Sequence, residues 1–238
     1  MKKISNIQYL FFKNRFDIIA GTGDQMYISK VYVDVKIPAV LHDLSSLNFF
    51  HETLKKISGG GEPLYRIDNV PLDQTGYIQP VVLISEKKPD FADKKIPAGY
   101  IAKIETFEYD IPVRNGMVYK FLLKANPSVK IFFKHTDLET EESWRKWLES
   151  EGYVNGFELV DSKYTDDGYV TCAEKKAKYL SVIFEGSMKI TDEKKFRKAL
   201  ICGVGRGREY GLGLLSIESF GCKNRNIAEE MKNSHSSN

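Results

Sequence analysis

The chain has 238 residues, 42% of them hydrophobic and 28% charged, a balance typical of a globular protein with one large or two small domains. Its formal charge of +3 is too small to indicate nucleic-acid binding by itself, so the distribution of charge matters more than the total. The three cysteines include no C-x-x-C pair, which argues against a disulfide framework or a zinc site and favours a reduced, cytoplasmic setting. We expect no membrane span, because no apolar run approaches roughly 20 residues. We expect no secretory signal, because Lys13, Asn14 and Arg15 interrupt the short apolar patch at 9–12 and no small-residue cleavage site follows.

The first half of the chain predicts an N-terminal extension followed by a small α+β domain. Residues 1–25 form the extension, and from residue 26 valines at every second position predict a strand with one buried face. Apolar residues three and four apart predict a helix over 46–58, which three consecutive glycines end. Further strands are expected at 63–68, 79–85 and 100–108, which places the first domain at 26–112.

The second half predicts a complete β-α-β-β-α-β unit with an additional hairpin at its edge. The expected elements are a strand from Met117, a helix between a Thr140 cap and Gly152, strands at 156–161, 168–173 and 178–190, a helix from Asp192 to Gly203, and a strand at 212–218. This order is that of a ferredoxin-like domain, and the first half repeats it without the second helix. We therefore predict two tandem ferredoxin-like domains with antiparallel sheets, over 26–112 and 113–220, followed by a polar tail at 221–238.

The most informative segment is GVGRGREYGLGLLS at 203–216, where five glycines surround Arg206 and Arg208. Glycine reaches positive φ and lets a ligand approach the backbone, and guanidinium groups suit phosphate oxygens. The segment matches neither a P-loop nor the dinucleotide motif, because Arg208 and Tyr210 stand where those motifs need glycine. It is either a phosphate-holding loop of another kind or a glycine-rich turn without a ligand, and a nucleotide-dependent enzyme is disfavoured.

Several further phrases accompany the glycine segment. They are FLLKANPSVK at 121–130, SVIFEGSMKIT at 181–191, His51-x-Thr53-Leu54, and the start MYISKV at 26–31. Together they resemble the CRISPR repeat-processing endoribonucleases of type I-E systems, the CasE group of the RAMP superfamily. The resemblance implies two ferredoxin-like (RAMP, RRM-like) domains without a cofactor. It also implies metal-independent cleavage of precursor CRISPR RNA within the repeat hairpin, leaving 2′,3′-cyclic phosphate and 5′-OH ends.

Cleavage of RNA by its own 2′-OH needs a proton-transfer group and a cation, and a histidine suits the first task. His51 lies at the rim of the apolar face of the helix expected at 46–58, where spacing alone is also compatible with a packing role. His42 precedes that helix, His135 falls in a lysine-flanked loop, and His235 is in the tail. The resemblance selects His51, because H-x-T-L carries the acid/base histidine of the family.

The resemblance also suggests two further catalytic candidates. Lys56 falls where the family often has a lysine near the scissile phosphate, although a solvated lysine fits the helix equally well. The family tyrosine has no direct equivalent, because residues 48–50 are Asn-Phe-Phe, and Tyr27 on the neighbouring strand is the substitute candidate. The sequence contains no cluster of carboxylate, His or Cys residues at ligand spacing, so it predicts no metal site.

RNA contacts are expected mainly with the phosphate backbone, since A-form RNA is recognised largely by shape. Arg206 and Arg208 are expected to clamp the backbone while Gly205 and Gly207 let it come close. The full set of RNA-binding candidates is Gly203, Gly205, Arg206, Gly207, Arg208, Lys124, Lys130, Lys134, Lys175, Lys176 and Lys178. The lysines at 175–178 are expected at a hairpin tip, where they could also be a solvated turn.

The implied partners are the CRISPR repeat RNA hairpin, the mature crRNA and the other Cascade subunits. The alternative is a non-catalytic RAMP subunit that only coats guide RNA. Such a subunit needs the glycine segment and the basic face but not His51.

Overall fold

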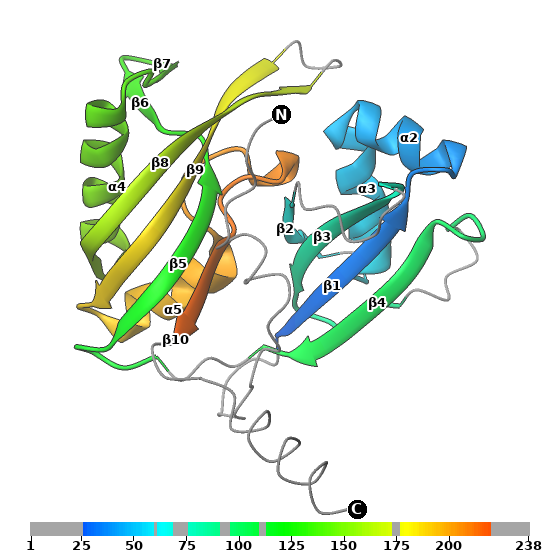
Figure 1. Cartoon of the computed structure of the whole chain (residues 1–238), viewed down its shortest axis with the longest axis horizontal. Coiled ribbons are helices and arrows are strands. Elements are labelled where there is room, and N and C mark those ends of the chain that lie inside the picture. Colours follow the sequence, from blue (N-terminus) through cyan, green and yellow to red (C-terminus); the bar gives the residue numbers. More distant parts are fainter. Residues whose placement is uncertain are drawn as a thin grey trace, which may run out of the picture.

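A computed structural model describes residues 26–59, 61–68, 76–90, 96–109, 113–172 and 177–219. They form two lobes that lie side by side, each built on a four-stranded sheet (Figure 1). The first lobe comprises residues 26–109 and the second lobe residues 113–219. No helix within these ranges has the length and apolar character needed to cross a bilayer.

Over its described residues, the first lobe has the ferredoxin-like order without the second helix, as predicted. Its elements are β1 (Tyr27–Asp34), α2 (Pro38–Ser45), α3 (Leu47–Ile57), β2 (Leu64–Ile67), β3 (Ile78–Ser85) and β4 (Ile101–Glu108). The strand order is β2-β3-β1-β4, and β1 is antiparallel to both of its neighbours. Helix α2 was not predicted from the apolar spacing. It begins at Pro38, a residue favoured in the first helical turn, and contains His42.

The second lobe is a complete ferredoxin-like unit. Its elements are β5 (Val118–Ala125), β6 (Ser128–Ile131), β7 (Lys134–Asp137), α4 (Glu141–Asn155), β8 (Phe157–Cys172), β9 (Ala177–Ile190), α5 (Glu193–Cys202), the 3-10 helix η1 (Arg208–Tyr210) and β10 (Leu215–Ser219). The strand order β10-β5-β9-β8 confirms the predicted fold class of two antiparallel ferredoxin-like units.

The prediction of two separate strands at 156–161 and 168–173, joined as a hairpin, is wrong. Strand β8 runs unbroken for 16 residues, and its pairing register with β9 shifts between Asp166 and Gly168. The sequence Asp-Asp-Gly predicts a turn, but here it forms a bulge inside a long strand. The additional hairpin lies elsewhere, at β6–β7, in the segment where His135 was expected to be in a loop.

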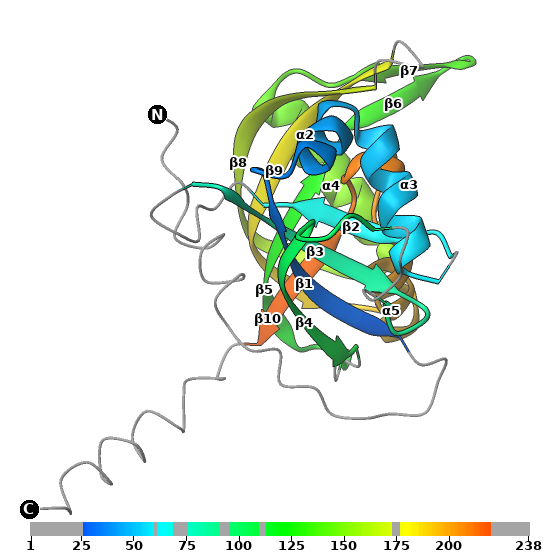
Figure 2. The same cartoon turned by 90° about the vertical axis from the view of Figure 1, so that its right-hand side faces the viewer.

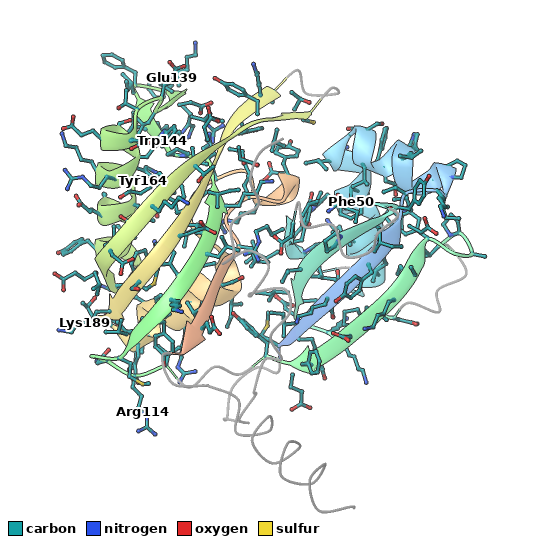
Figure 3. The ribbon with its side chains drawn as sticks, in the orientation of Figure 1. Phe50, Arg114, Glu139, Trp144, Tyr164 and Lys189 are labelled. Carbon is teal, nitrogen blue, oxygen red and sulfur yellow. The ribbon has the colours of Figure 1, made fainter. Side chains whose placement is uncertain are left out.

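Each lobe has its own apolar core on one face of its sheet. In the first lobe, Phe50, Leu54 and Ile57 of α3 are buried against β1 and β3, and Figure 3 labels Phe50 at this contact. In the second lobe, Trp144 and Trp147 of α4 pack on the sheet formed by β5 and β9. The helix that carries His51 is therefore fixed to the sheet along its apolar face, and His51 is among its buried residues.

A buried arginine joins the two lobes. Arg66 of β2 donates hydrogen bonds through Nε and Nη2 to both carboxylate oxygens of Asp68, at 2.5 and 3.2 Å. Its Nη1 also donates to Ser216 Oγ of β10, at 2.8 Å, and to the Leu214 carbonyl oxygen at 3.4 Å. Leu214 lies in an apolar cluster with residues of β1, β2 and β3. Polar and apolar contacts thus both hold the lobes in one orientation.

Candidate active site

The H-x-T-L motif positions His51 at the junction of the two lobes. Leu54 is in the core, and the Thr53 hydroxyl donates to Asp43 Oδ2 of α2 at 2.7 Å. The same Asp43 oxygen accepts the Tyr100 hydroxyl at 2.8 Å, which fastens α3 to the rest of the lobe. His51 lies on α3, which contacts η1 and β8 of the second lobe, and only 8% of its side chain is exposed.

One carboxylate bridges His51 and a lysine. His51 Nε2 lies 3.0 Å from Glu62 Oε2, and the Lys55 ammonium donates to the other oxygen, Oε1. Residues four apart share a helix face, so Lys55 and His51 point the same way. Glu62 is 69% exposed, and the hydrogen bonds from Lys55 and then His51 hold the pKa of its carboxyl below the usual value. His51 Nδ1 is buried and has no hydrogen-bond partner within the described ranges.

The glycine segment adopts the left-handed backbone that its composition predicts. Gly203, Gly205, Gly207, Gly211 and Gly213 have φ between +76° and +87°. A Cβ at Gly205 would lie 3.0 Å from the Trp147 ring, and one at Gly207 would lie 3.0 Å from Leu212. The space that these two glycines leave is therefore filled by protein. The expectation that their missing side chains make room for RNA is not supported on this side of the segment.

Tyr65 brings the glycine segment to His51. Its ring lies 6.1 Å from the imidazole, and its hydroxyl donates to the Glu209 carbonyl oxygen at 2.9 Å. Burial raises the pKa of Tyr65, so the hydroxyl remains a protonated donor. A Cβ at Gly211 would lie 3.1 Å from the same ring. Residues far apart in the sequence and in different lobes thus form one site, and the orange η1 segment lies between the lobes in Figure 1.

The two arginines of the segment are held by aromatic and backbone contacts. The Arg206 guanidinium lies 4.9 Å from the Tyr179 ring centroid, and Tyr179 packs on Tyr210 at 5.0 Å. Arg208 is exposed, and its Nε donates to the Gly205 carbonyl oxygen at 3.3 Å. Neither arginine takes part in an ion pair in the portion of the chain that the structure describes. Within the described residues, no carboxylate in direct contact therefore neutralises either guanidinium group.

The other two catalytic candidates lie farther from the imidazole face. Lys56 is exposed, one position beyond Lys55, so helix geometry turns it away from the face that His51 and Lys55 share. Tyr27 is the first residue of β1 and half-buried, and by strand alternation it lies on the sheet side that α3 covers. The hydrogen bonds of the described residues include none between Tyr27 and His51.

The lysine candidates fall into three groups. Lys124 is 12% exposed and forms an ion pair with Asp167 at 2.8 Å, so its charge is already paired within the protein. Lys130 and Lys134 are exposed on the β6–β7 hairpin, and Lys178 on β9 lies 3.7 Å from the Tyr169 ring centroid. Lys175 and Lys176 lie outside the described residues.

The K-A-N-P phrase supports the glycine segment from the second lobe. Asn126 is fully buried, and its side-chain amide donates to Asp137 Oδ1 and to the Leu180 carbonyl oxygen, both at 2.9 Å. Its backbone pairs with Arg206 in an isolated antiparallel bridge. The F-E-G phrase has a packing role, because a Cβ at Gly186 would lie 2.2 Å from the Asp161 carbonyl oxygen.

Two contributors to the site were missed from the sequence. Lys55 could have been selected in place of Lys56, since helix geometry places the fourth residue after His51, and not the fifth, on its face. Glu62 lies in the segment after α3, and nothing in its local sequence indicates that it returns to the histidine. Within the described residues, no group of His, Cys, Asp and Glu side chains could hold a metal ion.

Comparison with known families identifies the chain. The family model described as "CRISPR associated protein" matches residues 26–219, which span both lobes and all the contacts above. The chain belongs to this family. The match begins at the residue where the MYISKV phrase starts, and the resemblance found in the sequence is confirmed.

This CRISPR-associated protein has relatives of known structure. It is 26% identical over 215 residues to the CRISPR-associated endoribonuclease Cse3 of Thermus thermophilus, covering 81% of this chain and 99% of the relative. The structure of Thermus thermophilus Cse3 bound to an RNA representing a pre-cleavage complex matches with a TM-score of 0.72 at 24% identity, covering 82% of this chain and 99% of that one. The Escherichia coli K-12 protein Cas6e matches with a TM-score of 0.63 at 20% identity, covering 82% and 100%. These structural matches agree with the ferredoxin-like fold of both lobes.

Proposed function

We propose that this protein is a metal-independent endoribonuclease that cleaves precursor CRISPR RNA within the repeat hairpin. It then stays on the mature crRNA as a subunit of Cascade, in the cytoplasm. The observation that carries the proposal is the junction of the lobes, where α3, the helix that carries His51 and Lys55, contacts η1 of the glycine-arginine segment. Membership of a CRISPR-associated family and the similarity to Cse3 support the same conclusion.

The chemistry needs only groups that this junction contains. The 2′-oxygen of the RNA attacks the adjacent phosphorus, the bond from phosphorus to the 5′-oxygen breaks, and a 2′,3′-cyclic phosphate forms. The 2′-hydroxyl loses a proton and the leaving 5′-oxygen gains one, which is the task of His51 as acid/base. Cationic side chains stabilise the additional negative charge of the transition state, and Lys55 lies beside His51 for this purpose.

The remaining candidates have supporting roles in this proposal. Lys56 and Tyr27 are second-choice partners of His51, as a cation near the phosphate and as a hydroxyl donor. Arg206 and Arg208 hold the RNA backbone beside the histidine. Lys130, Lys134 and Lys178, with Lys175 and Lys176 beyond the described residues, extend the basic surface along the second lobe.

The proposal is tested by incubating the protein with its cognate CRISPR repeat RNA in excess EDTA. We expect cleavage at the same rate as in buffer with Mg²⁺, and products that carry a 2′,3′-cyclic phosphate and a 5′-OH. Mass spectrometry of the fragments identifies both ends. Inhibition by EDTA would contradict the metal-independent mechanism, and tight binding without cleavage would identify a non-catalytic RNA-coating subunit.

The Glu62 carboxylate lies between His51 and Lys55 and contacts both side chains. In our proposal an RNA phosphate would need the same two side chains as donors, so Glu62 competes with it. Replacing it by glutamine removes a negative charge from between His51 and Lys55, so Glu62→Gln should bind repeat RNA about two- to fivefold more tightly at low salt. That range corresponds to the ~0.5–1 kcal/mol of an exposed charge interaction. Filter binding at several salt concentrations measures it, and the gain should shrink as salt rises.

Glu158→Gln is the matched control. It removes the same charge from an exposed position of β8, where Glu158 makes no hydrogen bond or ion pair with His51 or Lys55 among the described residues. An affinity gain of equal size in both variants would be a general charge effect. Unchanged affinity together with slower cleavage in Glu62→Gln would instead make Glu62 a residue that orients His51.

A further inference from the structure

The β6–β7 hairpin carries the most exposed aromatic side chains among the described residues. Phe132 and Phe133 form its two-residue turn and are 91% and 96% exposed, and Ile131 beside them is about half exposed. Figure 2 shows the hairpin projecting beyond the rest of the molecule. Apolar side chains of this size at a tip point to a binding surface, because they contribute nothing to either core.

The turn also has an unfavourable backbone. Phe132 has φ +54°, a left-handed conformation in which the described chain otherwise places only glycine. The first position of such a turn normally carries glycine, asparagine or aspartate, and a bulky residue in the left-handed region is sterically unfavourable there. A phenylalanine at this position therefore favours a role for the side chain itself over a role in the turn.

The root of the hairpin is fixed to the glycine segment. Asp137 at the end of β7 accepts hydrogen bonds from the Asn126 side chain and from the Leu180 backbone, at 2.9 and 3.0 Å. Asn126 in turn pairs through its backbone with Arg206. The tip is thus an extension of the surface to which we assign RNA binding, held in place from β9 and from the glycine segment.

The charges on the hairpin favour RNA over an apolar protein surface. Lys130 and His135 face each other across the two strands, and Lys134 adjoins the turn. All three side chains are exposed, and none of them forms an ion pair within the described part of the chain. Aromatic rings flanked by basic side chains are the arrangement that binds single-stranded nucleic acid, with bases stacking on the rings and phosphates on the cations.

We propose that the hairpin 128–137 binds an unpaired stretch of RNA that flanks the repeat stem. Phe132 and Phe133 stack on its bases, and Lys130 and Lys134 contact its phosphates. This assignment rests on the proposed function, because it extends the same RNA surface to a part of the substrate outside the cleaved hairpin.

The test compares two labelled RNAs, a blunt repeat stem-loop and the same stem-loop with about eight unpaired nucleotides on each side, within the span of a single-strand site. The double variant F132A/F133A should bind the flanked RNA at least about 30-fold more weakly, since two stacked bases each contribute ~1 kcal/mol or more. Its affinity for the blunt RNA and its salt dependence should stay at the wild-type values, because it loses no charge. F132W/F133W should retain wild-type affinity for both RNAs.

Tyr153→Ala is the matched control, because this tyrosine of α4 is 84% exposed and belongs to another surface. It should leave both affinities unchanged. Equal affinities of F132A/F133A and wild type for the flanked RNA would overturn the inference, and so would an equal loss on both RNAs. It would also be overturned if the double variant lost only its association with another protein subunit. Failure of the wild type to bind or cleave even the blunt stem-loop would instead refute the proposed function.

Discussion

Replacing His51 by alanine should slow cleavage of repeat RNA by about 10² or more while the affinity for that RNA is retained. The factor is the contribution expected of a positioned proton-transfer group. Affinity should persist because the charges that we assign to phosphate binding, on Arg206 and Arg208, are left in place. Single-turnover cleavage rates and filter-binding affinities measure the two quantities separately.

His42→Ala is the control for this prediction. His42 lies on α2, the helix before α3, and stacks on Phe49 of α3 with ring centroids 4.6 Å apart. It is exposed, and no hydrogen bond or ring contact among the described residues joins it to His51. It should cleave at the wild-type rate. RNA with a 2′-deoxy nucleotide at the cut site gives the background rate. Cleavage by His51→Ala at the wild-type rate would remove His51 from the mechanism, and a lowered unfolding midpoint would show that the loss is structural.

Elements with one buried face could be predicted from the sequence to within a few residues. Helix α3 follows from the spacing of Phe50, Leu54 and Ile57, and the core strands follow from their alternation. The β6–β7 hairpin could not be predicted in this way, because its side chains are mostly exposed and no face is buried. The sequence predicts two strands in place of β8 because Asp166-Asp167-Gly168 has the composition of a turn. Only the pairing of β8 with β9 along its whole length shows that this tripeptide is a bulge.

The residue types of the candidate site follow from the sequence, and their assembly does not. His51 and the glycine segment are both candidates from the sequence, but periodicity says nothing about which surfaces meet between lobes. The contact between α3 and the glycine segment depends on Tyr65. The sequence indicates only an ordinary core residue of a short strand, whereas in the folded chain its hydroxyl donates to the Glu209 carbonyl oxygen. The positive φ of the glycines follows from their residue type. The reason for glycine at Gly205 is the nearby Trp147 ring, and that contact exists only in the folded chain.

Replacing Arg66 by alanine should lower the free energy of unfolding by about 3 kcal/mol, at the lower end of the ~3–5 kcal/mol measured when one partner of a buried ion pair is removed. The variant leaves the Asp68 carboxylate buried and takes a donor from Ser216. We expect the lower value because Asp68 also interacts electrostatically with Lys30, a buried cation that the substitution leaves in place and that partly compensates the Asp68 charge. The pKa of Lys30 is lowered chiefly by burial and raised by Glu105 and Asp68. Urea unfolding followed by circular dichroism measures the change.

Two controls separate charge burial from general damage to the lobe junction. The double variant R66M/D68L removes both charges and should recover most of the stability, because an apolar pair of similar volume often replaces a buried ion pair without loss. Arg145→Ala breaks an exposed pair with Glu149 on α4 and should cost only about 0.5 kcal/mol or less. A loss below about 1 kcal/mol in Arg66→Ala would mean that the Arg66 ion pair contributes little and that the other contacts, such as the apolar cluster around Leu214 and the Tyr65–Glu209 hydrogen bond, hold the lobes together. Because His51 and the glycine segment belong to different lobes, Arg66→Ala should also cleave more slowly than R66M/D68L under conditions where both are folded.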